Sequence, residues 1–304
     1  LTMEDPYLLH VFSPTKYVSP FDINMAYEAR YDAVIPYCNV TLDEIHPLTQ
    51  DTIFSRSPEG VRRTGIFIGG REFHLAIDML HAARKAMVPP FAVSVLADPS
   101  GAITTAAAMV ALAERWLAKI DGSDMTGRRV YVFGGTGPVG NCVGLLAARC
   151  GAEVALVSNR GAQEAQASAE ACNSRYGVTM RGVDGGQPGA IERILDDAEI
   201  VFNAAKAGIR VLDNAALAKA KCLKIAADAN AVPPSGIEGV AAKDNGVEVA
   251  TAGGTARGLG ALAIGDIKYR VHTGLLAQMY ESDEPIYLAH EEAFALARSN
   301  VAAR

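Results

Sequence analysis

Short apolar runs alternate along this chain with longer segments in which apolar residues recur at helical spacing. In the first hundred residues the pattern predicts strands at 8–13, 33–37, 64–70 and 91–97. Helices are predicted from Pro20, with Ser19 placed to cap it, and near Phe73. Strands that alternate with helices indicate a parallel sheet with right-handed crossovers, so an α/β domain is expected here.

The rest of the chain repeats this alternation after an alanine-rich helix predicted at 104–120, which is expected to connect two domains. Strands are predicted at 130–133, 153–157, near 178, at 199–204 and at 223–227, with helices at 141–150, 162–176 and 189–195 and a further segment at 215–220. Residues 253–260 are expected to form a second glycine-rich loop, and 262–279 and 286–297 to form helices.

The predicted fold class is α/β with two domains and a cleft between them. Residues 1–110 are expected to form an N-terminal α/β substrate domain, and residues 111–269 a Rossmann-type domain with a parallel sheet. The C-terminal helices, within residues 270–304, are expected to pack back on the first domain.

A glycine-rich turn follows the strand at 130–133 and organises the second domain. Gly135, Gly137 and Gly140 have the G-x-G-x-x-G spacing, in which the glycines allow a tight turn, close approach of a pyrophosphate and close packing of helix on strand. Unpaired N–H groups and the helix dipole favour phosphate at the start of the following helix. The predicted dinucleotide contacts are Gly135, Thr136, Gly137, Pro138, Val139 and Gly140.

The next strand ends at Ser158, Asn159 and Arg160, where a protein that prefers NAD usually places an acidic residue. The Arg160 guanidinium and the Ser158 hydroxyl suit a 2′-phosphate instead, so NADP is predicted over NAD. Further cofactor contacts are expected from residues at or just beyond later strand ends, because ligands bind there in open α/β sheets: Ala205, Lys206, Asp228 and Asn230.

Composition narrows the class of protein further. The chain has 304 residues, is 50% hydrophobic and carries a formal net charge of −6, so it can bury a large core and is not expected to bind nucleic acid. Five widely spaced cysteines without a C-x-x-C pair favour free thiols, and no metal site is expected. The N-terminal sequence is charged where a secretory signal is apolar, and no apolar run has transmembrane length, so a cytoplasmic protein with no membrane partner is predicted.

No acid–base or nucleophile group stands out, since the six histidines fall in separate segments and there is no G-x-S-x-G sequence. This favours hydride transfer to an existing carbocation, which needs no proton donor. Shikimate-type dehydrogenases also carry a glycine turn followed by an Asn-Arg strand end, and Asn39, Val40 and Thr41 match the start of their substrate motif. The catalytic lysine of that motif is missing here, because the sequence continues with Leu42 and Asp43.

A closer resemblance covers nearly the whole chain. The motifs that carry it are 19–22 (SPFD), 64–70 (TGIFIGG), 98–108, 135–140 (GTGPVG), 227–237 (ADANAVPPSGI) and 260–268 (GALAIGDIK). Together and in this order, they resemble the bacterial methylene-tetrahydromethanopterin dehydrogenases of methylotrophs. The resemblance implies a homo-oligomer that oxidises a methylene-tetrahydropterin reversibly to its methenyl form in one-carbon metabolism, with NADP or with either nucleotide.

The resemblance also implies site residues. Thr105 and Lys268 are expected to face the cleft and orient the pterin, and Asp22, Asp98 and Thr104 are further substrate-binding candidates. Two alternatives stay open. Tetrahydrofolate presents the same reacting atoms as tetrahydromethanopterin, and an NADP-binding sensor without turnover would keep the glycine turn but not need Lys268 or Thr105.

Overall fold

The computed structural model describes residues 5–303, and the chain divides into two compact units. Unit 1 comprises Leu1–Thr104 and Tyr269–Leu296, and unit 2 comprises Thr105–Lys268 and Ala297–Arg304. Part of the N-terminal sequence from which the absence of a secretory signal was predicted, residues 1–4, lies outside the described residues.

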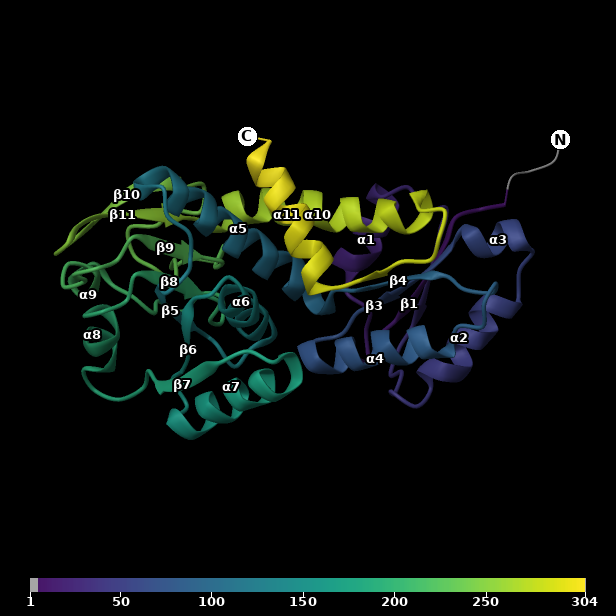
Figure 1. The fold of residues 1–304 in the computed structure, drawn as a ribbon, viewed down its shortest axis with the longest axis horizontal. Helices are drawn as coiled ribbons and strands as arrows, with labels where there is room; N and C mark the ends of the chain where they lie inside the picture. Colours follow the sequence, from purple (N-terminus) through teal and green to yellow (C-terminus); the bar gives the residue numbers. More distant parts are fainter. Residues whose placement is uncertain (1–4, 304) are drawn as a thin grey trace. The chain divides into compact units, whose positions relative to one another are not determined.

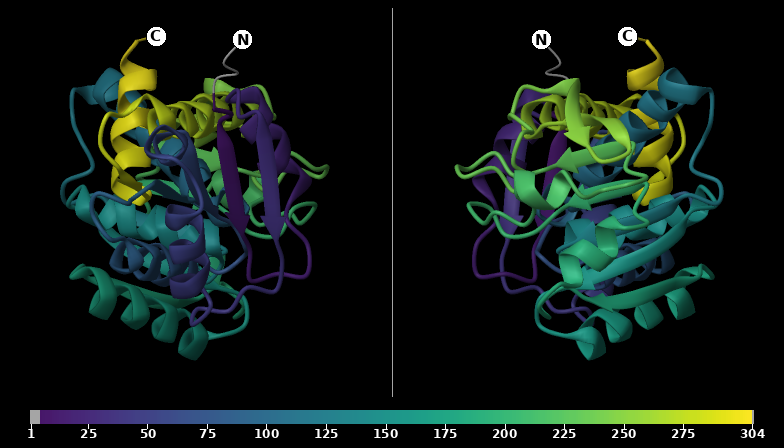
Figure 2. Two further views of the ribbon diagram at one scale, coloured as in Figure 1. Left: turned by 90° about the vertical axis from the view of Figure 1, so that its right-hand side faces the viewer. Right: turned by 90° about the vertical axis from the view of Figure 1, so that its left-hand side faces the viewer.

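Unit 1 is built on a five-stranded parallel sheet in the order β12-β4-β3-β1-β2 (Figure 1). The purple strands β1 and β2 lie side by side in the left view of Figure 2. The elements of this unit are β1 (Leu8–Phe12), α1 (Pro20–Glu28), β2 (Ala33–Tyr37), α2 (Ile45–Phe54), α3 (Pro58–Arg62), β3 (Thr64–Ile68), α4 (Phe73–Ala86), β4 (Ser94–Ala97) and β12 (Tyr287–Leu288). Helices α5 (Ala102–Asp121), α10 (Ala261–Glu281) and α11 (His290–Ala302) each have residues in both units.

Both faces of this sheet are covered, as a parallel sheet requires. Ile66 and Ile68 of β3 belong to a core that also holds buried residues of α2, α3 and α4. Gly65 points to the opposite face, where a Cβ would lie 2.7 Å from the Met279 side chain of α10 and 3.1 Å from the Tyr31 hydroxyl. The absence of a side chain at Gly65 therefore lets α10 pack directly on the strand.

Unit 2 contains a seven-stranded sheet in the order β10-β11-β9-β8-β5-β6-β7, parallel except for β10. Its elements are β5 (Arg129–Phe133), α6 (Pro138–Arg149), β6 (Glu153–Ser158), α7 (Ala162–Tyr176), β7 (Met180–Asp184), α8 (Ala190–Leu195), β8 (Ile200–Asn203), α9 (Asn214–Leu217), β9 (Ile225–Asp228), β10 (Asn245–Thr251) and β11 (Gly254–Leu259). The strand order reverses between β5 and β8, which is the switch point of a Rossmann-type sheet. The predicted α/β fold class is confirmed.

Helices cover both faces of the second sheet. On one face α6 packs against β6, where a Cβ at Gly144 would lie 2.7 Å from Leu156 Cδ2. Buried residues of α8 and α9 pack on the other face, against Tyr131, Phe133 and their neighbours in β6, β8 and β9. The glycine turn after β5 is thus supported from both sides of the sheet.

Several details differ from the sequence-based expectations. The predicted glycine-rich loop at 253–260 is wrong, because Gly254–Leu259 is strand β11, paired antiparallel with β10 and parallel with β9. Within this strand, position 258 favours glycine because an added Cβ would come within 3.1–3.2 Å of the Val249 and Val240 side chains. Helices α2 and α3 and strand β10 were not predicted, and the last helix begins at His290 rather than 286 because Tyr287–Leu288 joins the first sheet.

The C-terminal helices are divided between the units: residues 269–296 group with unit 1 and residues 297–303 with unit 2, and their packing on the first domain stays a prediction. Arg298 makes two hydrogen bonds with the Glu114 carboxylate of α5, at 2.8 Å from Nε and 2.6 Å from Nη2. A bidentate pair of this kind fixes direction as well as distance. It explains why the end of α11 stays with unit 2.

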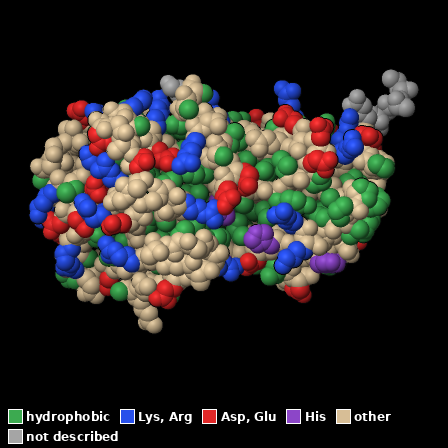
Figure 3. All heavy atoms as spheres, in the orientation of Figure 1, with side chains coloured by type: hydrophobic (Ala, Val, Ile, Leu, Met, Phe, Trp, Pro, Cys, Tyr) green, Lys and Arg blue, Asp and Glu red, His purple; other side chains and the backbone are tan. Residues whose placement is uncertain are grey.

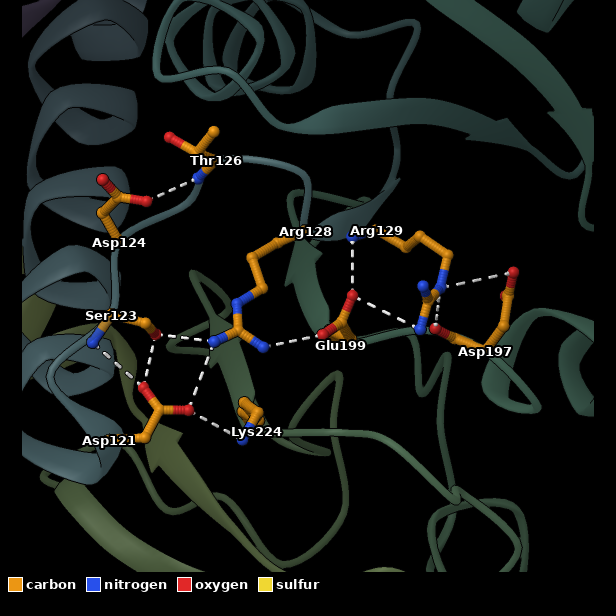
Figure 4. A network of polar contacts seen from close by, with 9 residues as sticks. All are labelled: Asp121, Ser123, Asp124, Thr126, Arg128, Arg129, Asp197, Glu199 and Lys224. Carbon is orange, nitrogen blue, oxygen red and sulfur yellow. Dashed lines mark hydrogen bonds and ion pairs between the residues drawn. The ribbon is translucent and has the colours of Figure 1, made fainter.

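A network of ionic side chains lies at the amino ends of β5, β8 and β9 (Figure 4). Arg128 Nη1 donates to Glu199 at 2.8 Å, and the Arg129 backbone N–H donates to the same carboxylate at 3.1 Å. Asp121, at the end of α5, accepts from Arg128 at 3.2 Å and pairs with Lys224 at 2.9 Å. This network ties α5 to the sheet at the end opposite the glycine turn.

The surface carries interspersed charges of both signs on the face shown in Figure 3. In unit 1, hydrophobic side chains gather near α3 and the end of α2; Phe54 and Phe91 are exposed, with ring centroids 5.5 Å apart. None of the helices in the described part of the chain has the length and apolar character needed to cross a bilayer.

Candidate dinucleotide site

The glycine turn joins β5 to α6 and is held by its own backbone. Gly134 has a φ of 70°, a left-handed conformation that favours glycine, and its carbonyl accepts from Gly137 N–H at 3.0 Å. Gly137 is the N-cap of α6, with Pro138 at the first helical position, where no backbone donor is needed. The first N–H groups of α6 thus have no carbonyl one turn earlier to bind, and together with the helix dipole they favour an anion.

The glycines of the turn have different reasons for lacking a side chain. A Cβ at Gly134 would lie 2.5 Å from Ala205 N, one at Gly135 2.8 Å from Leu156 Cβ, and one at Gly140 2.3 Å from Gly134 O. These positions are needed for packing. At Gly137 the nearest atom to an added Cβ is Gly134 O at 3.4 Å, an ordinary contact, and its φ of −82° suits any residue.

Packing therefore does not explain Gly137. The remaining reason for a glycine there is room for a ligand to approach the backbone, which is the role of the second glycine in a dinucleotide turn. The turn fits a pyrophosphate on this structural ground, independent of sequence spacing.

Asn141 holds the turn in shape and was not predicted as a site residue. Its side-chain amide donates to Gly135 O at 2.9 Å and Gly137 O at 3.0 Å, and its Oδ1 accepts from Ser168 at 3.2 Å. The side chain is buried. Because one amide satisfies two turn carbonyls, Asn141 preorganises the backbone that would meet the phosphates.

A pocket of about 430 Å³ opens at the carboxyl ends of β5, β6 and β8, on both sides of the switch point. This is the place where open α/β sheets bind nucleotides. Six of the predicted cofactor residues line it: Thr136, Gly137, Ser158, Arg160, Ala205 and Lys206. Gly135, Pro138, Val139 and Gly140 lie in the same turn and the start of α6.

Three cationic side chains line the pocket in a chain whose net charge is negative: Arg160, Lys206 and Arg210. Arg210 also pairs with Glu238 at 2.7 Å. Local positive charge at the end of a parallel sheet favours an anionic ligand. The residues present fit a dinucleotide.

The Ser158 and Arg160 side chains are not free for a ligand in this structure, because Glu164 binds both. Ser158 Oγ donates to Glu164 Oε2 at 2.7 Å, and Arg160 Nε donates to the same oxygen at 2.8 Å. Arg160 Nη2 pairs with the other carboxylate oxygen and lies 3.4 Å from Thr136 Oγ1. Glu164 was missed from the sequence, because Arg160 lies before the start of α7 and the rule for ion pairs within a helix does not apply to the two residues.

The predicted contacts Asp228 and Asn230 lie at the carboxyl end of β9 and are not among the described residues that line the pocket. Asp228 is buried and accepts from the Asn203 amide at 2.8 Å and from Ile237 N–H at 3.0 Å. Asn230 Oδ1 accepts from Gly208 N–H at 3.2 Å. These bonds shape the loops after β8 and β9, so both residues support the site, and direct cofactor contact by either stays a prediction.

Two of the substrate candidates in unit 1 form one buried cluster. Asp98, at the end of β4, accepts from Thr104 Oγ1 at 2.6 Å and from the backbone N–H groups of Ile103 and Thr104 at 2.8 and 3.2 Å. Its Oδ2 also lies 2.9 Å from Nδ1 of His272 on α10. Asp98, Thr104 and His272 are fully buried. The cluster caps the start of α5, and contact of Asp98 or Thr104 with substrate stays a prediction.

The remaining candidates are Asp22, Thr105 and Lys268. Asp22 is buried in the first turn of α1, where a Cβ added to Gly69 would lie 3.4 Å from its Oδ2. Thr105 of α5 and Lys268 of α10 are half-buried. The chain passes from unit 1 to unit 2 between Thr104 and Thr105, and returns between Lys268 and Tyr269.

Comparison with known proteins agrees with the fold. Quinate dehydrogenase from Corynebacterium glutamicum, whose structure contains NAD, superimposes with a TM-score of 0.53 at 15% identity, over 98% of this chain and 99% of the other. With the glycine turn and pocket of unit 2, this defines a two-unit α/β protein with a Rossmann-type fold.

Sequence relatives narrow the class to a family. Residues 20–100 match the family model described as methylene-tetrahydromethanopterin dehydrogenase, N-terminal. The NAD(P)-dependent methylenetetrahydromethanopterin dehydrogenase of Methylorubrum extorquens is 41% identical over 95% of this chain and 97% of its own length. The bifunctional protein MdtA of the same organism is 35% identical over 96% and 98%. The chain belongs to the methylene-tetrahydromethanopterin dehydrogenase family, which confirms the resemblance seen in its motifs.

Proposed function

We propose that this protein catalyses reversible hydride transfer between methylene-tetrahydromethanopterin and NADP, giving the methenyl pterin, in one-carbon (formaldehyde) metabolism. The observation that carries the proposal is the full-length relative named for this reaction, at 41% identity. The structure supports it with a glycine turn in which Gly137 is required by neither packing nor backbone conformation.

The nucleotide would be held by residues of unit 2. The start of α6 and the turn around Gly137 meet the pyrophosphate, with Asn141 fixing the turn carbonyls. Ser158 and Arg160 meet the 2′-phosphate through charge-assisted hydrogen bonds. Lys206 adds positive charge at the mouth of the pocket.

The chemistry needs few groups from the protein. When bound, NADP supplies the acceptor for a hydride, and the methenyl carbon left behind shares its positive charge with two nitrogens. No enzyme acid or base is needed, so the work of the chain is positioning and electrostatics. We assign the positioning of the pterin to Thr105 and Lys268, by the pattern of the family.

The assay mixes the protein, methylene-tetrahydromethanopterin and NADP, and follows reduced nucleotide and methenyl absorbance together. Both are expected to rise at equal rates. Absence of turnover with NADP and with NAD would refute the proposal. A protein that binds nucleotide yet transfers no hydride from any reduced pterin would be the non-catalytic sensor.

The identity of the pterin that carries the one-carbon unit is the second question to test. Methylene-tetrahydrofolate has the same reacting atoms, so the kcat/KM values on the two carriers are compared under one condition. A higher value with the methanopterin carrier supports the proposal, and a higher value with the folate carrier replaces it with a methylene-tetrahydrofolate dehydrogenase.

The assignment of Lys268 and Thr105 has its own test. Lys268→Ala and Thr105→Ala are each expected to lower kcat/KM for the pterin by about tenfold or more, since orientation contributes strongly to such reactions. The NADP Kd is expected to stay within about twofold of wild type, because neither residue is among the described residues that line the nucleotide pocket. A raised NADP Kd would move them to the cofactor site.

We also propose a cytoplasmic homo-oligomer. All five cysteines are free thiols, in line with a reducing compartment. The exposed Phe54 and Phe91 rings on unit 1 are the kind of apolar surface that a second copy covers. Light scattering coupled to size-exclusion chromatography is expected to give a mass above the 32.0 kDa of one chain, and a monomer would contradict this.

A further inference from the structure

We propose that Glu164 is a specificity-determining residue that sets the balance between NADP and NAD. The inference rests on the proposed nucleotide site of unit 2, but not on the identity of the pterin. It concerns the carboxylate that occupies, in this structure, the two groups assigned to the 2′-phosphate.

The contacts of Glu164 are those of an anion in a binding site. One oxygen accepts from the Ser158 hydroxyl at 2.7 Å and from Arg160 Nε at 2.8 Å, and the other pairs with Arg160 Nη2. Ser158 in turn accepts from the Arg160 backbone N–H at 3.1 Å. A 2′-phosphate would seek the same hydroxyl and guanidinium, so it must displace the carboxylate from at least one of them.

Glu164 also supplies what the strand end lacks. A dinucleotide fold that takes NAD has an acidic residue at the end of the second strand, to accept the ribose hydroxyl. Here β6 ends at Ser158 without one, but the bond from Ser158 holds the Glu164 carboxylate at that strand end from the first turn of α7. The chain therefore carries both the guanidinium suited to NADP and the carboxylate suited to NAD, as a pair.

The pair is accessible enough to rearrange. The Arg160 side chain is 69% exposed and that of Glu164 35% exposed, so the ion pair is screened by solvent and is a modest competitor for a phosphate. A carboxylate in the first turn of α7 is also favoured by the helix dipole, which alone would explain its presence. The two roles predict different nucleotide binding.

The experiment measures the Kd of NADP and of NAD by isothermal titration calorimetry, without pterin. Glu164→Gln keeps the size of the side chain and removes its charge. It is expected to lower the NADP Kd by about threefold to tenfold, equivalent to about 0.7 to 1.4 kcal/mol, and to leave the NAD Kd unchanged or higher. The control is Glu170→Gln, which removes an equal charge from an exposed position of the same helix and is expected to leave both Kd values within about twofold of wild type.

A double variant tests the route of the effect. In an Arg160→Ala background there is no guanidinium for the carboxylate to hold. The fold decrease in NADP Kd caused by Glu164→Gln is therefore expected to be less than half of the fold decrease that the same change causes in the wild type. An undiminished effect in that background would overturn the pair as the mechanism. An unchanged ratio of the two Kd values in Glu164→Gln would overturn the proposal, as would equal changes in Glu170→Gln.

The outcomes separate this inference from the proposed reaction. A shifted Kd ratio in a protein that transfers no hydride would refute the reaction and leave Glu164 as the selector. Turnover on the methanopterin carrier together with an unshifted ratio of the NADP and NAD Kd values would support the reaction and refute the role of Glu164. Failure of the wild type to bind either nucleotide would overturn both.

Discussion

Replacing Gly137 and Gly140 by alanine separates the binding role of the turn from its packing role. At Gly137 an added Cβ would meet only Gly134 O at an ordinary 3.4 Å, with a φ of −82° that alanine adopts freely. Gly137→Ala is stabilised because alanine restricts the unfolded chain, and destabilised because alanine is a poorer N-cap than glycine; each effect changes the free energy of unfolding by roughly 0.5–1 kcal/mol. Its free energy of unfolding is therefore expected to stay within about 1 kcal/mol of wild type.

At Gly140 the same methyl group would lie 2.3 Å from Gly134 O, about 1 Å inside a normal carbon–oxygen contact. Both groups are backbone, so α6 must move away from the strand. Overpacking of this kind costs about 1–3 kcal/mol, and about 2–4 °C of Tm per kcal/mol follows for a domain of this size. Gly140→Ala is expected to lower the Tm by roughly 2–12 °C.

Calorimetric titration with NADP and thermal unfolding of the free proteins measure the two effects. Gly137→Ala is expected to raise the NADP Kd by about tenfold or more, because the methyl group fills the approach to the α6 N–H groups. For Gly140→Ala the main expected change is the lowered Tm of the free protein. A Gly137→Ala protein that binds NADP as tightly as wild type would refute the assignment of this turn to the pyrophosphate.

Further variants test hydrogen bonds and ion pairs that stabilise each of the two units. Asn141→Ala removes the side-chain donor of Gly135 O and leaves Gly137 O with the backbone N–H of residue 141 alone, so it is expected to cost about 1–3 kcal/mol and to weaken NADP binding, as followed by urea unfolding and titration. Burial disfavours ionisation of Glu199, but the hydrogen bond from Arg128 and the neighbouring charges outweigh it and lower its pKa. Its stabilisation is therefore complete above about pH 4.3 and is lost as pH falls through the lowered folded-state pKa, so Glu199→Gln should flatten the acid side of a Tm–pH curve; an unchanged slope would contradict this. Asp98→Asn, which disturbs the bonds to α5 and His272, is expected to lower the free energy of unfolding by about 1–3 kcal/mol, and unchanged stability with a raised pterin KM would instead make Asp98 a substrate ligand.

The sequence allowed the frame of the nucleotide site to be predicted because its signals are local. An apolar strand, a glycine turn and a helix that begins at Pro138 lie within one short stretch, and Ser158 and Arg160 lie at and just beyond the end of the next strand. What spacing could not distinguish was why each glycine is there. Only the neighbours of each Cβ position show that Gly140 serves packing and that Gly137 does not.

Other features depend on contacts between distant residues. Gly254–Leu259 has two glycines in six residues and carries a weak strand signal, yet pairing with β9 and β10 makes it β11. Asn203 and Asp228 are 25 positions apart, and only the parallel pairing of β8 with β9 places them 2.8 Å from each other. Tertiary contacts, which a single sequence does not display, decide these features.

Transfer of deuterium tests the central claim most directly. The protein is mixed with NADP and methylene-tetrahydromethanopterin carrying deuterium in its methylene group, and the reduced nucleotide is analysed by mass spectrometry. Direct hydride transfer predicts one deuterium in each reduced nucleotide for every methenyl pterin formed from dideuterated carrier, with none passing to water. Deuterium recovered in water, or methenyl pterin formed without reduced nucleotide, would contradict it.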